Sequence, residues 1–173
     1  MSADGPTRAW RNRALVGLVA AGAVGLDALS KQWAVSSLEP GYPREVMGGV
    51  IRLDLSFNPG MAFSQFRSGG AVFGVVAAVA VVAILWYAGR VTSPLVLTGL
   101  GFICGGAAGN LVDRIFRGPG WLEGNVVDFV SLPSWPTFNL ADTFLTVGVV
   151  CVVVGIFLSD RRERRAHAAG TDA

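Results

Sequence analysis

The chain has 173 residues, of which 52% are hydrophobic and only 15% are charged, and its mean hydropathy is +0.53. A soluble domain carries about 25% charged residues, so this composition excludes an ordinary soluble protein. The formal net charge of +2 is too small to indicate a nucleic-acid partner, and none is expected.

Four stretches of the chain are almost free of charge. They cover 14–30, which only Asp27 interrupts, and then 68–89, 91–112 and 143–159. Since roughly 20 apolar residues cross a bilayer as a helix, we predict a membrane all-α fold in one domain, 1–173. Its transmembrane helices are expected at about 13–33, 69–89, 92–112 and 140–159, with disordered tails at 1–9 and 164–173.

The first stretch has an alternative interpretation as a cleaved signal peptide, because arginines precede an apolar run. That run, however, continues through Asp27 and Lys31 and has no clean A-x-A-like cleavage site. We therefore expect it to be a retained helix.

The basic residues predict which side of the membrane each end occupies. Arginines cluster in both tails, and only Arg90 lies in the short connection between the second and third helices. By the positive-inside rule, both tails and this connection are cytoplasmic, and the segment 34–68 lies outside. The protein is therefore expected to be a multi-pass membrane protein with both termini in the cytoplasm.

The outer segment between the first two helices contains a short pattern typical of a strand. Apolar residues from Ile51 to Phe57 alternate with polar ones, which predicts a strand with one buried face. Turn residues flank it at Gly48-Gly49 and at Asn58-Pro59-Gly60. We expect a small extracytoplasmic β-element here, and a second outer loop at 114–136.

Glycines recur at every fourth position in the third predicted helix, at Gly101, Gly105 and Gly109. This spacing favours close packing against a neighbouring helix. Glycine is also generally common in membrane helices, so the pattern alone leaves both interpretations open.

Polar residues from distant parts of the chain are predicted to meet at one end of this bundle. Carboxylates and other charged groups are costly at membrane depth, by about 2.5–3.5 kcal/mol each, and are rare there without a purpose. The charged and amide residues predicted to meet there are Asp27, Lys31, Asn58, Asn110, Asp113, Arg114, Asp128, Asn139 and Asp142.

The residue types in this cluster limit the chemistry that it can perform. It has no histidine, no serine or cysteine beside a base, and no metal-ligand set of His and Cys. Two carboxylates close together hold one proton between them near neutral pH, so that one can activate water while the other donates a proton. This composition permits an aspartyl hydrolase, while a small ion transporter or a structural protein with a polar belt remain alternatives.

Five short motifs carrying these residues resemble, in the same order, those of the lipoprotein signal peptidases, also called signal peptidase II. They are Asp27-Ala-Leu-Ser-Lys31, Asn58-Pro-Gly60-Met-Ala62-Phe63, Gly105-Gly-Ala-Ala-Gly-Asn110-Leu-Val-Asp113-Arg114, Val126-Val127-Asp128-Phe129 and Phe138-Asn139-Leu-Ala-Asp142. Each motif is weak alone, but the five together cover 27–146.

The resemblance implies that Asp128 and Asp142 form the catalytic dyad of a membrane aspartyl protease. It also implies that Asn58, Asn110 and Asn139 line the substrate site, with Gly60 and Arg114 beside them. By the same resemblance, Asp27 and Asp113 are expected to be polar groups that support the site structurally. We further expect Lys31 and Arg114 to offset acidic partners and to address the lipid headgroup region.

The implied substrates are prolipoproteins whose cysteine carries a diacylglyceryl group. The resemblance implies cleavage just before that cysteine, at the outer face of the bacterial cytoplasmic membrane, among membrane lipids and without a metal or organic cofactor. This sequence departs from the family pattern mainly in a Gly/Pro-containing stretch at 117–124, which leaves open the shape of the loop that precedes Asp128.

Overall fold

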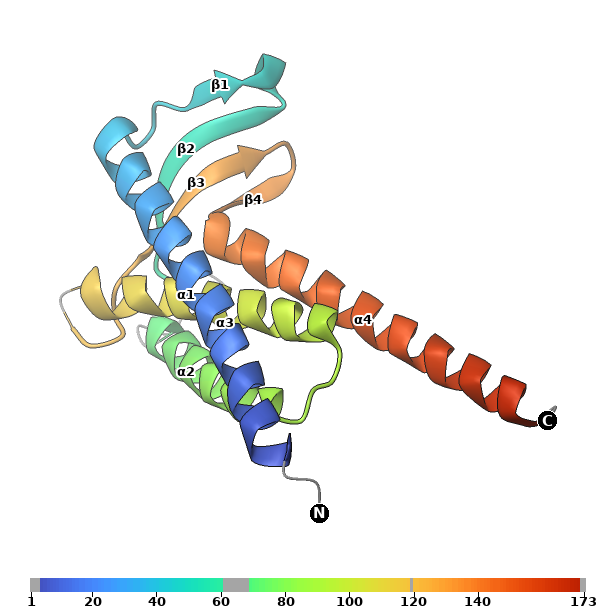
Figure 1. Cartoon of the computed structure of the whole chain (residues 1–173). Coiled ribbons are helices and arrows are strands. Elements are labelled where there is room, and N and C mark those ends of the chain that lie inside the picture. The colour runs from blue at the N-terminus through green and yellow to red at the C-terminus, as the bar shows by residue number, and fades with distance from the viewer. Residues whose placement is uncertain (1–3, 61–68, 119, 172–173) are drawn as a thin grey trace.

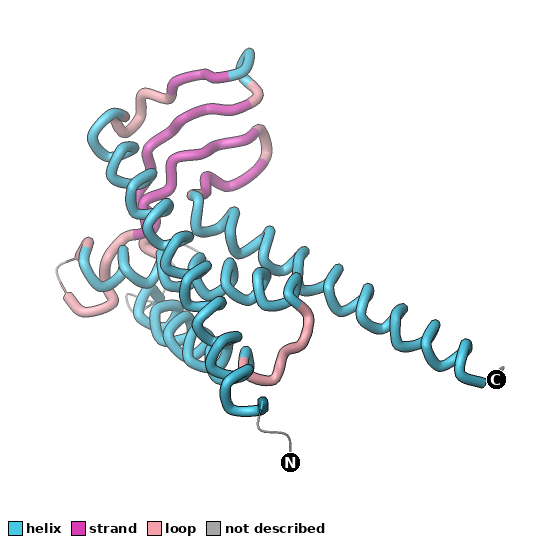
Figure 2. The backbone as a smooth tube through the Cα atoms, in the orientation of Figure 1, coloured by secondary structure: helices cyan, strands magenta, loops and turns pink. Residues whose placement is uncertain are grey.

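The computed structural model describes residues 4–60, 69–118 and 120–171, which form four long helices and one small sheet (Figure 1). In chain order the elements are α1 (Asp4–Ser37), β1 (Arg44–Val46), a 3-10 turn (Met47–Gly49), β2 (Ile51–Asn58), α2 (Gly69–Ala88), α3 (Pro94–Phe116), β3 (Val126–Leu132), β4 (Trp135–Phe138) and α4 (Leu140–Thr171). The sheet lies at one end of the helices, away from both chain ends (Figure 2).

All four helices are long and apolar enough to cross a membrane, which confirms the four predicted spans. Helices α1 and α4 are longer than predicted, and residues 4–9 and 164–171 are helical where disordered tails were expected. In α4 the charged extension is rich in the good helix formers Arg, Glu and Ala, and it has an ion pair of 2.9 Å between Asp160 and Arg164 one turn apart. Residues 1–3 and 172–173 of the expected tails lie outside the described residues.

Helix α3 is the central helix, because each of the other three helices packs more extensively against it than against any other helix. Its predicted glycine face does contact a neighbour. A methyl group added at Gly101 or Gly105 would lie 2.6 Å from the Cβ of Val19 or Ala23 of α1, respectively. These glycines therefore let α1 approach α3 more closely than any side chain would allow.

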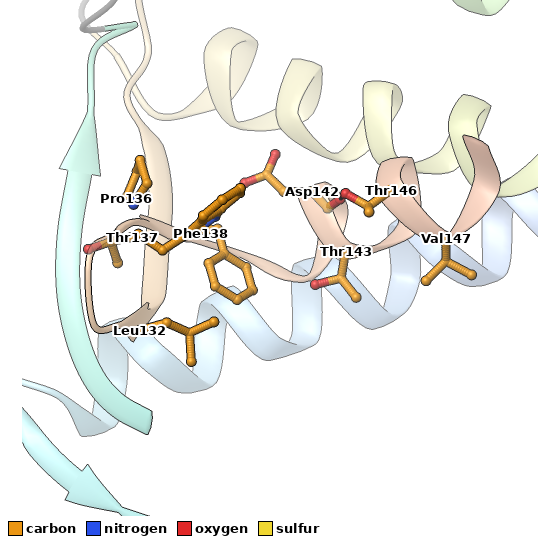
Figure 3. A pocket seen from close by; sticks show the side chains of 9 residues that line it. Leu132, Pro136, Thr137, Phe138, Asp142, Thr143, Thr146 and Val147 are labelled. Atoms are coloured by element: carbon orange, nitrogen blue, oxygen red, sulfur yellow. Dashed lines mark hydrogen bonds between the residues drawn. The ribbon is translucent and has the colours of Figure 1, made fainter. Parts of the chain in front are cut away.

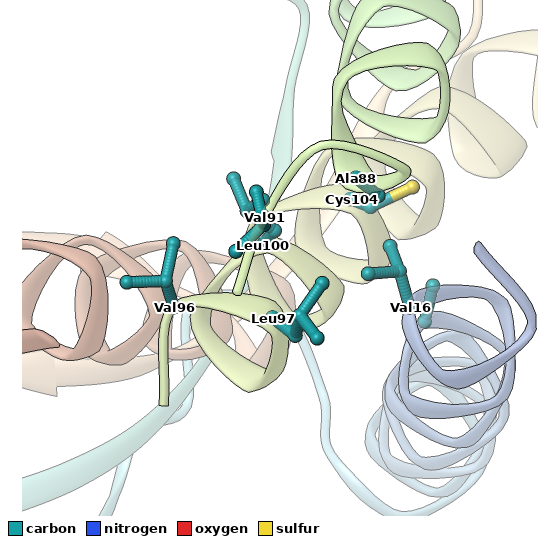
Figure 4. Close-up of a cluster of buried hydrophobic side chains, with 8 residues drawn as sticks. Val16, Ala88, Val91, Val96, Leu97, Leu100 and Cys104 are labelled. Atoms are coloured by element: carbon teal, nitrogen blue, oxygen red, sulfur yellow. The ribbon is translucent and has the colours of Figure 1, made fainter. Parts of the chain in front are cut away.

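A cluster of buried apolar side chains holds the helices together at the end opposite the sheet (Figure 4). Val16 of α1 meets Leu97 and Leu100 of α3 there, and Cys104 is buried beside them as a small packing residue. The Asn12 side-chain amide donates to the Val91 carbonyl oxygen over 2.8 Å, which ties α1 to the connection between α2 and α3.

The sheet is antiparallel, with strand order β1-β2-β3-β4. Its first two strands come from the segment predicted to form the β-element. The predicted outer loop at 114–136, whose shape the sequence left open, contains β3 and the first two residues of β4. Residues Val126–Phe129 are all buried, so β3 has no alternation of polar and apolar residues that would have revealed it.

A bulge interrupts the pairing of β2 with β3. Leu53 pairs with Val130 and Ser56 pairs with Asp128, so two residues of β2 lie opposite Phe129. A bulge reverses the side-chain alternation of the strand beyond it. The predicted single face is therefore divided, because Leu53 lies on the face of Ser56 and Asp128, whereas Leu55 and Phe57 lie on the other face. On that face Leu55 is buried and Phe57 is 45% exposed.

Candidate active site

Asp128 lies on β3 and is buried, at the end of the molecule that contains the sheet. Its neighbours in the strand, Val127 and Phe129, pack against Ala34 and Leu38 of α1. Since successive side chains of a strand point to opposite faces, Asp128 points away from α1. The backbone N–H of Val127 donates to Asp113 Oδ2 over 3.2 Å, which anchors the strand to α3.

Two asparagine side chains hold the carboxylate of Asp128. Asn58 Nδ2 donates to Asp128 Oδ2 over 3.0 Å, and Asn139 Nδ2 donates to Oδ1 over 2.6 Å. The β2 bulge makes the first bond possible, because Asn58 lies two residues beyond Ser56, the residue opposite Asp128. Without the extra residue, Asn58 would lie on the other face of the sheet.

Asp142 lies in the first turn of α4 and closes a reciprocal cap with Asn139, the residue before the helix. The backbone N–H of Asp142 donates to Asn139 Oδ1 over 3.0 Å, and the backbone N–H of Asn139 donates to Asp142 Oδ2 over 3.3 Å. This arrangement satisfies two otherwise unpaired N–H groups of the helix start. The motif that fixes Asp142 is therefore also the motif that begins α4.

Asn139 and Asn110 connect the two carboxylates. Asn139 contacts Asp128 through its side chain and Asp142 through its backbone, and it has no solvent-exposed surface. Asn110 of α3 donates from Nδ2 to Asp142 Oδ1 over 2.8 Å and accepts from Asn139 Nδ2 over 3.1 Å. Strand β3, helix α3 and helix α4 thus supply one continuous hydrogen-bond network.

The environment of Asp128 favours its protonated form more than water does. Burial is the main cause that raises the pKa of Asp128 from 3.8 to about 6, and the charge of Asp142 adds to the rise. The hydrogen bonds from Asn58 and Asn139 and the charge of Lys31 act in the opposite direction. Asp128 therefore keeps its proton to a higher pH than an exposed aspartate does.

Lys31 is completely buried, which contradicts the expectation that it addresses lipid headgroups. Its ammonium group lies 2.7 Å from Asp27 Oδ2 and 2.8 Å from Asp113 Oδ2, and it donates to Asn110 Oδ1 over 2.9 Å. The expectation that it offsets acidic partners is confirmed. The sequence placed Asp27 and Lys31 on one helix face at this end of the bundle but gave no indication that their side chains are buried inside the protein.

Arg114 and Gly60 lie at the edges of the network. Arg114 donates to the Asn110 carbonyl oxygen over 3.1 Å and lies 5.9 Å from the Phe73 ring centroid. The Gly60 N–H donates to Asn58 Oδ1 over 2.9 Å, with a φ of 90° that favours glycine. The rest of that motif, Met61 to Phe63, lies outside the described residues.

Sequence reasoning missed Arg117, which forms an ion pair of 2.7 Å with Asp113 Oδ1. Its position four residues after Asp113 on one helix was the available signal. Within the described residues, no three His, Cys, Asp or Glu side chains come together as metal ligands.

A groove of about 470 Å³ opens beside Asp142, between β4 and the start of α4 (Figure 3). Its walls are mostly apolar, with Trp135 and Phe138 on one side and Val147 on the other. Pockets that bind ligands are typically apolar with a few polar groups that fix orientation. Asp142 is such a group here, and Thr143 is another.

The buried charged and amide side chains of the described residues all belong to this one end of the molecule. A transporter would need polar groups through the full depth of the bundle. The opposite end instead contains the apolar cluster of Figure 4, so the arrangement favours a site that faces one side of the membrane.

Comparison with known proteins identifies close relatives of the chain. A family model described as signal peptidase (SPase) II matches residues 9–158. A lipoprotein signal peptidase of Mycobacterium avium is 44% identical over 151 residues, which cover 87% of this chain and 81% of the relative. One of Rhodococcus jostii is 40% identical over 144 residues, 83% of this chain and 73% of the relative.

A solved structure described as a bacterial membrane enzyme has the same fold. It superposes with a TM-score of 0.72 at 23% identity, covering 80% of this chain and 90% of the other.

Proposed function

The chain belongs to the signal peptidase II family, and from this we propose that it is an aspartic endopeptidase that removes signal peptides from prolipoproteins, with Asp128 and Asp142 as its catalytic pair. The observation that carries the proposal is the network around Asn139, which links these two carboxylates at one end of a membrane bundle.

In the proposed reaction the two aspartates share one proton. The ionised carboxylate accepts a proton from a water molecule, whose oxygen attacks the scissile carbonyl carbon. The protonated partner donates to the carbonyl oxygen. When the C–N bond breaks, the carboxyl group that took the water proton passes it to the leaving amine, and a hydroxyl of the tetrahedral intermediate returns a proton to the partner. The pair titrates as a unit. The amide donors from Asn58, Asn110 and Asn139 hold both carboxylates in place without exchanging protons themselves.

The proposed substrate is a prolipoprotein whose cysteine carries a diacylglyceryl group, cut just before that cysteine. The apolar groove beside Asp142 suits an apolar substrate segment. We place the site near the outer leaflet of the cytoplasmic membrane, with both termini inside, because the basic tails lie at the far end from the sheet. A lipid anchor would hold the scissile bond at this depth and reduce the entropic cost of positioning it.

The test is cleavage of a diacylglyceryl-modified prolipoprotein by purified enzyme in detergent, with the unlipidated peptide in parallel. Wild type should cut before the lipidated cysteine, and Asp128→Asn and Asp142→Asn should each lose more than about 1,000-fold in kcat, as enzymes do when a group of the catalytic unit is removed. Asp160→Asn is the matched control, since Asp160 is an exposed helical aspartate in an ion pair.

If either aspartate variant keeps wild-type turnover while folded, the pair is misassigned. If wild type cuts lipidated and unlipidated peptides equally well, the proposed substrate class is wrong. If it cuts neither, the peptidase proposal fails as a whole.

A further inference from the structure

Lys31 is a buried cation that the proposed reaction does not use. Its side chain has no exposed surface, and the carboxylates of Asp27 and Asp113 beside it are almost as inaccessible. An ammonium group has three N–H donors and no acceptor. Two donors meet these carboxylates, and the third meets Asn110 Oδ1.

The ionic side chains around Lys31 balance one another in charge, and the hydrogen bond from Lys31 to Asn110 is not needed for this balance. Asp27 and Asp113 carry two negative charges, and Lys31 and Arg117 carry two positive ones. Burying such a group is expensive, and an apolar replacement of similar shape is often as stable. Stability alone therefore gives little reason for a buried lysine that reaches a neutral amide of the candidate site.

The bond to Lys31 determines which way the Asn110 amide faces. Asn110 Oδ1 accepts from Lys31 at 2.9 Å and from Asn139 Nδ2 at 3.1 Å, which fills its two lone pairs. Because a lysine cannot accept a hydrogen bond, the amide cannot turn its NH₂ group toward Lys31. The NH₂ group must face Asp142, where Nδ2 lies 2.8 Å from Oδ1.

We propose that Lys31 is a positioning residue, which fixes the Asn110 amide with its donor toward Asp142 and so holds that carboxylate in its working orientation. The inference rests on the proposed function, because it assigns Lys31 a part in the same reaction. In the reversed orientation, Asn110 Oδ1 would face Asp142 Oδ1, and two acceptors would repel each other. Asp142 would then move away from the position in which it forms the reciprocal cap with Asn139.

The test uses two double variants that both remove the bond to Asn110 without leaving an unpaired buried charge. Asp27→Asn/Lys31→Met and Asp27→Asn/Lys31→Leu each neutralise Asp27, the carboxylate that pairs with Lys31, and leave Asp113 paired with Arg117. Their effects on packing differ, whereas the loss of the donor to Asn110 is common to both. Asp160→Asn/Arg164→Met removes an exposed ion pair of the same spacing and serves as the control.

In the cleavage assay, both double variants should lower kcat by roughly 10- to 100-fold with little change in KM, as expected when a reacting group is misplaced. In an Asn110→Ala background, the same substitutions should have no further effect, because Lys31 acts through Asn110. An equal fold loss in both backgrounds, or no loss in the native background, overturns the inference.

A second measurement does not depend on activity. In enzyme labelled with ¹⁵N-asparagine, the Asn110 side-chain NH₂ signal should shift, and its hydrogen exchange should accelerate at least about tenfold in both double variants, as its protection is lost. The control variant should leave it unchanged. An unchanged Asn110 signal in the double variants overturns the inference, whether or not wild type cleaves the substrate; a chain that shows the shift but cleaves nothing overturns only the proposed function.

Discussion

At the scale of single residues, the candidate site is built from amides around carboxylates. Asn139 alone contacts Asp128, Asp142 and Asn110, and its side chain also caps a helix. Each oxygen of Asp128 and of Asp142 accepts one hydrogen bond from an N–H donor. Neutral N–H donors thus orient both carboxylates without adding a titrating group to the network.

The raised pKa of Asp128 predicts how stability depends on pH. The folded-state value of about 6 lies above the ordinary 3.8, so the folded protein binds more protons than the unfolded one between these values. Stability from this group is therefore complete below about pH 4 and is lost as pH rises through 6, by about 3 kcal/mol. Asp128→Asn cannot titrate there.

The stability of Asp128→Asn relative to wild type should consequently improve between pH 4 and pH 7. Thermal unfolding in detergent across this range measures the difference, and Asp160→Asn, an exposed aspartate, should show little trend. A constant difference between Asp128→Asn and wild type over the whole range would contradict the raised pKa.

At the scale of elements, the helices and the polar end were predictable, and the sheet was only partly so. Long uncharged runs identify a membrane helix directly, and the charge of Asp27 did not hide α1. Strand β3 was not recognised because it is buried on both faces and carries an aspartate. The bulge that brings Asn58 to Asp128 depends on pairing between strands far apart in sequence, which no local pattern contains.

The polar residues were predictable as a group but not in their partners. The residue types and the helix directions placed Asn110, Asp128 and Asp142 at one depth. The burial of Lys31 depends on how closely α1 and α3 pack, which is decided by small residues along both helices. Side-chain type alone suggested an interfacial lysine.

The contact between α1 and α3 makes Gly109 a sensitive position. A Cβ atom there would lie 2.6 Å from Asp27 Oδ2, and neither the carboxylate nor the backbone can yield without disturbing the bond between Asp27 Oδ1 and the Ala141 N–H. Gly109→Ala should destabilise the protein by about 1–3 kcal/mol, as overpacking typically does.

Gly25→Ala is the matched control on α1, because nothing lies within 4 Å of the added methyl group. It should be neutral or stabilising by up to about 1 kcal/mol, since alanine favours a helix over glycine. Thermal unfolding of the two variants checks the prediction, and equal effects at both positions would show that α1 and α3 are not closely packed here.

At the scale of the whole molecule, the structure has one polar end and one apolar end, and the direction of insertion decides which side of the membrane the site serves. Cysteines introduced at Tyr42 and at Arg164, in a chain whose Cys104 and Cys151 are replaced by alanine, report this direction. Both positions are well exposed.

In intact cells, a membrane-impermeant maleimide should label Tyr42→Cys and should label Arg164→Cys only after lysis. The positive-inside rule gives this direction, because the arginine-rich end is retained in the cytoplasm. The reverse pattern would place the candidate site on the inner face and would rule out outer-face processing.

The cap shared by Asn139 and Asp142 has a consequence for synthesis. The proposed pair needs β3 and the first turn of α4, which follow α1, α2 and α3 in the chain and so emerge from the ribosome after them. Until α4 has formed, Asp142 has no fixed position and the Asn139 bridge does not exist. With Asp128 and Asp142 as the proposed pair, cleavage therefore has to wait until α4 has formed and is inserted.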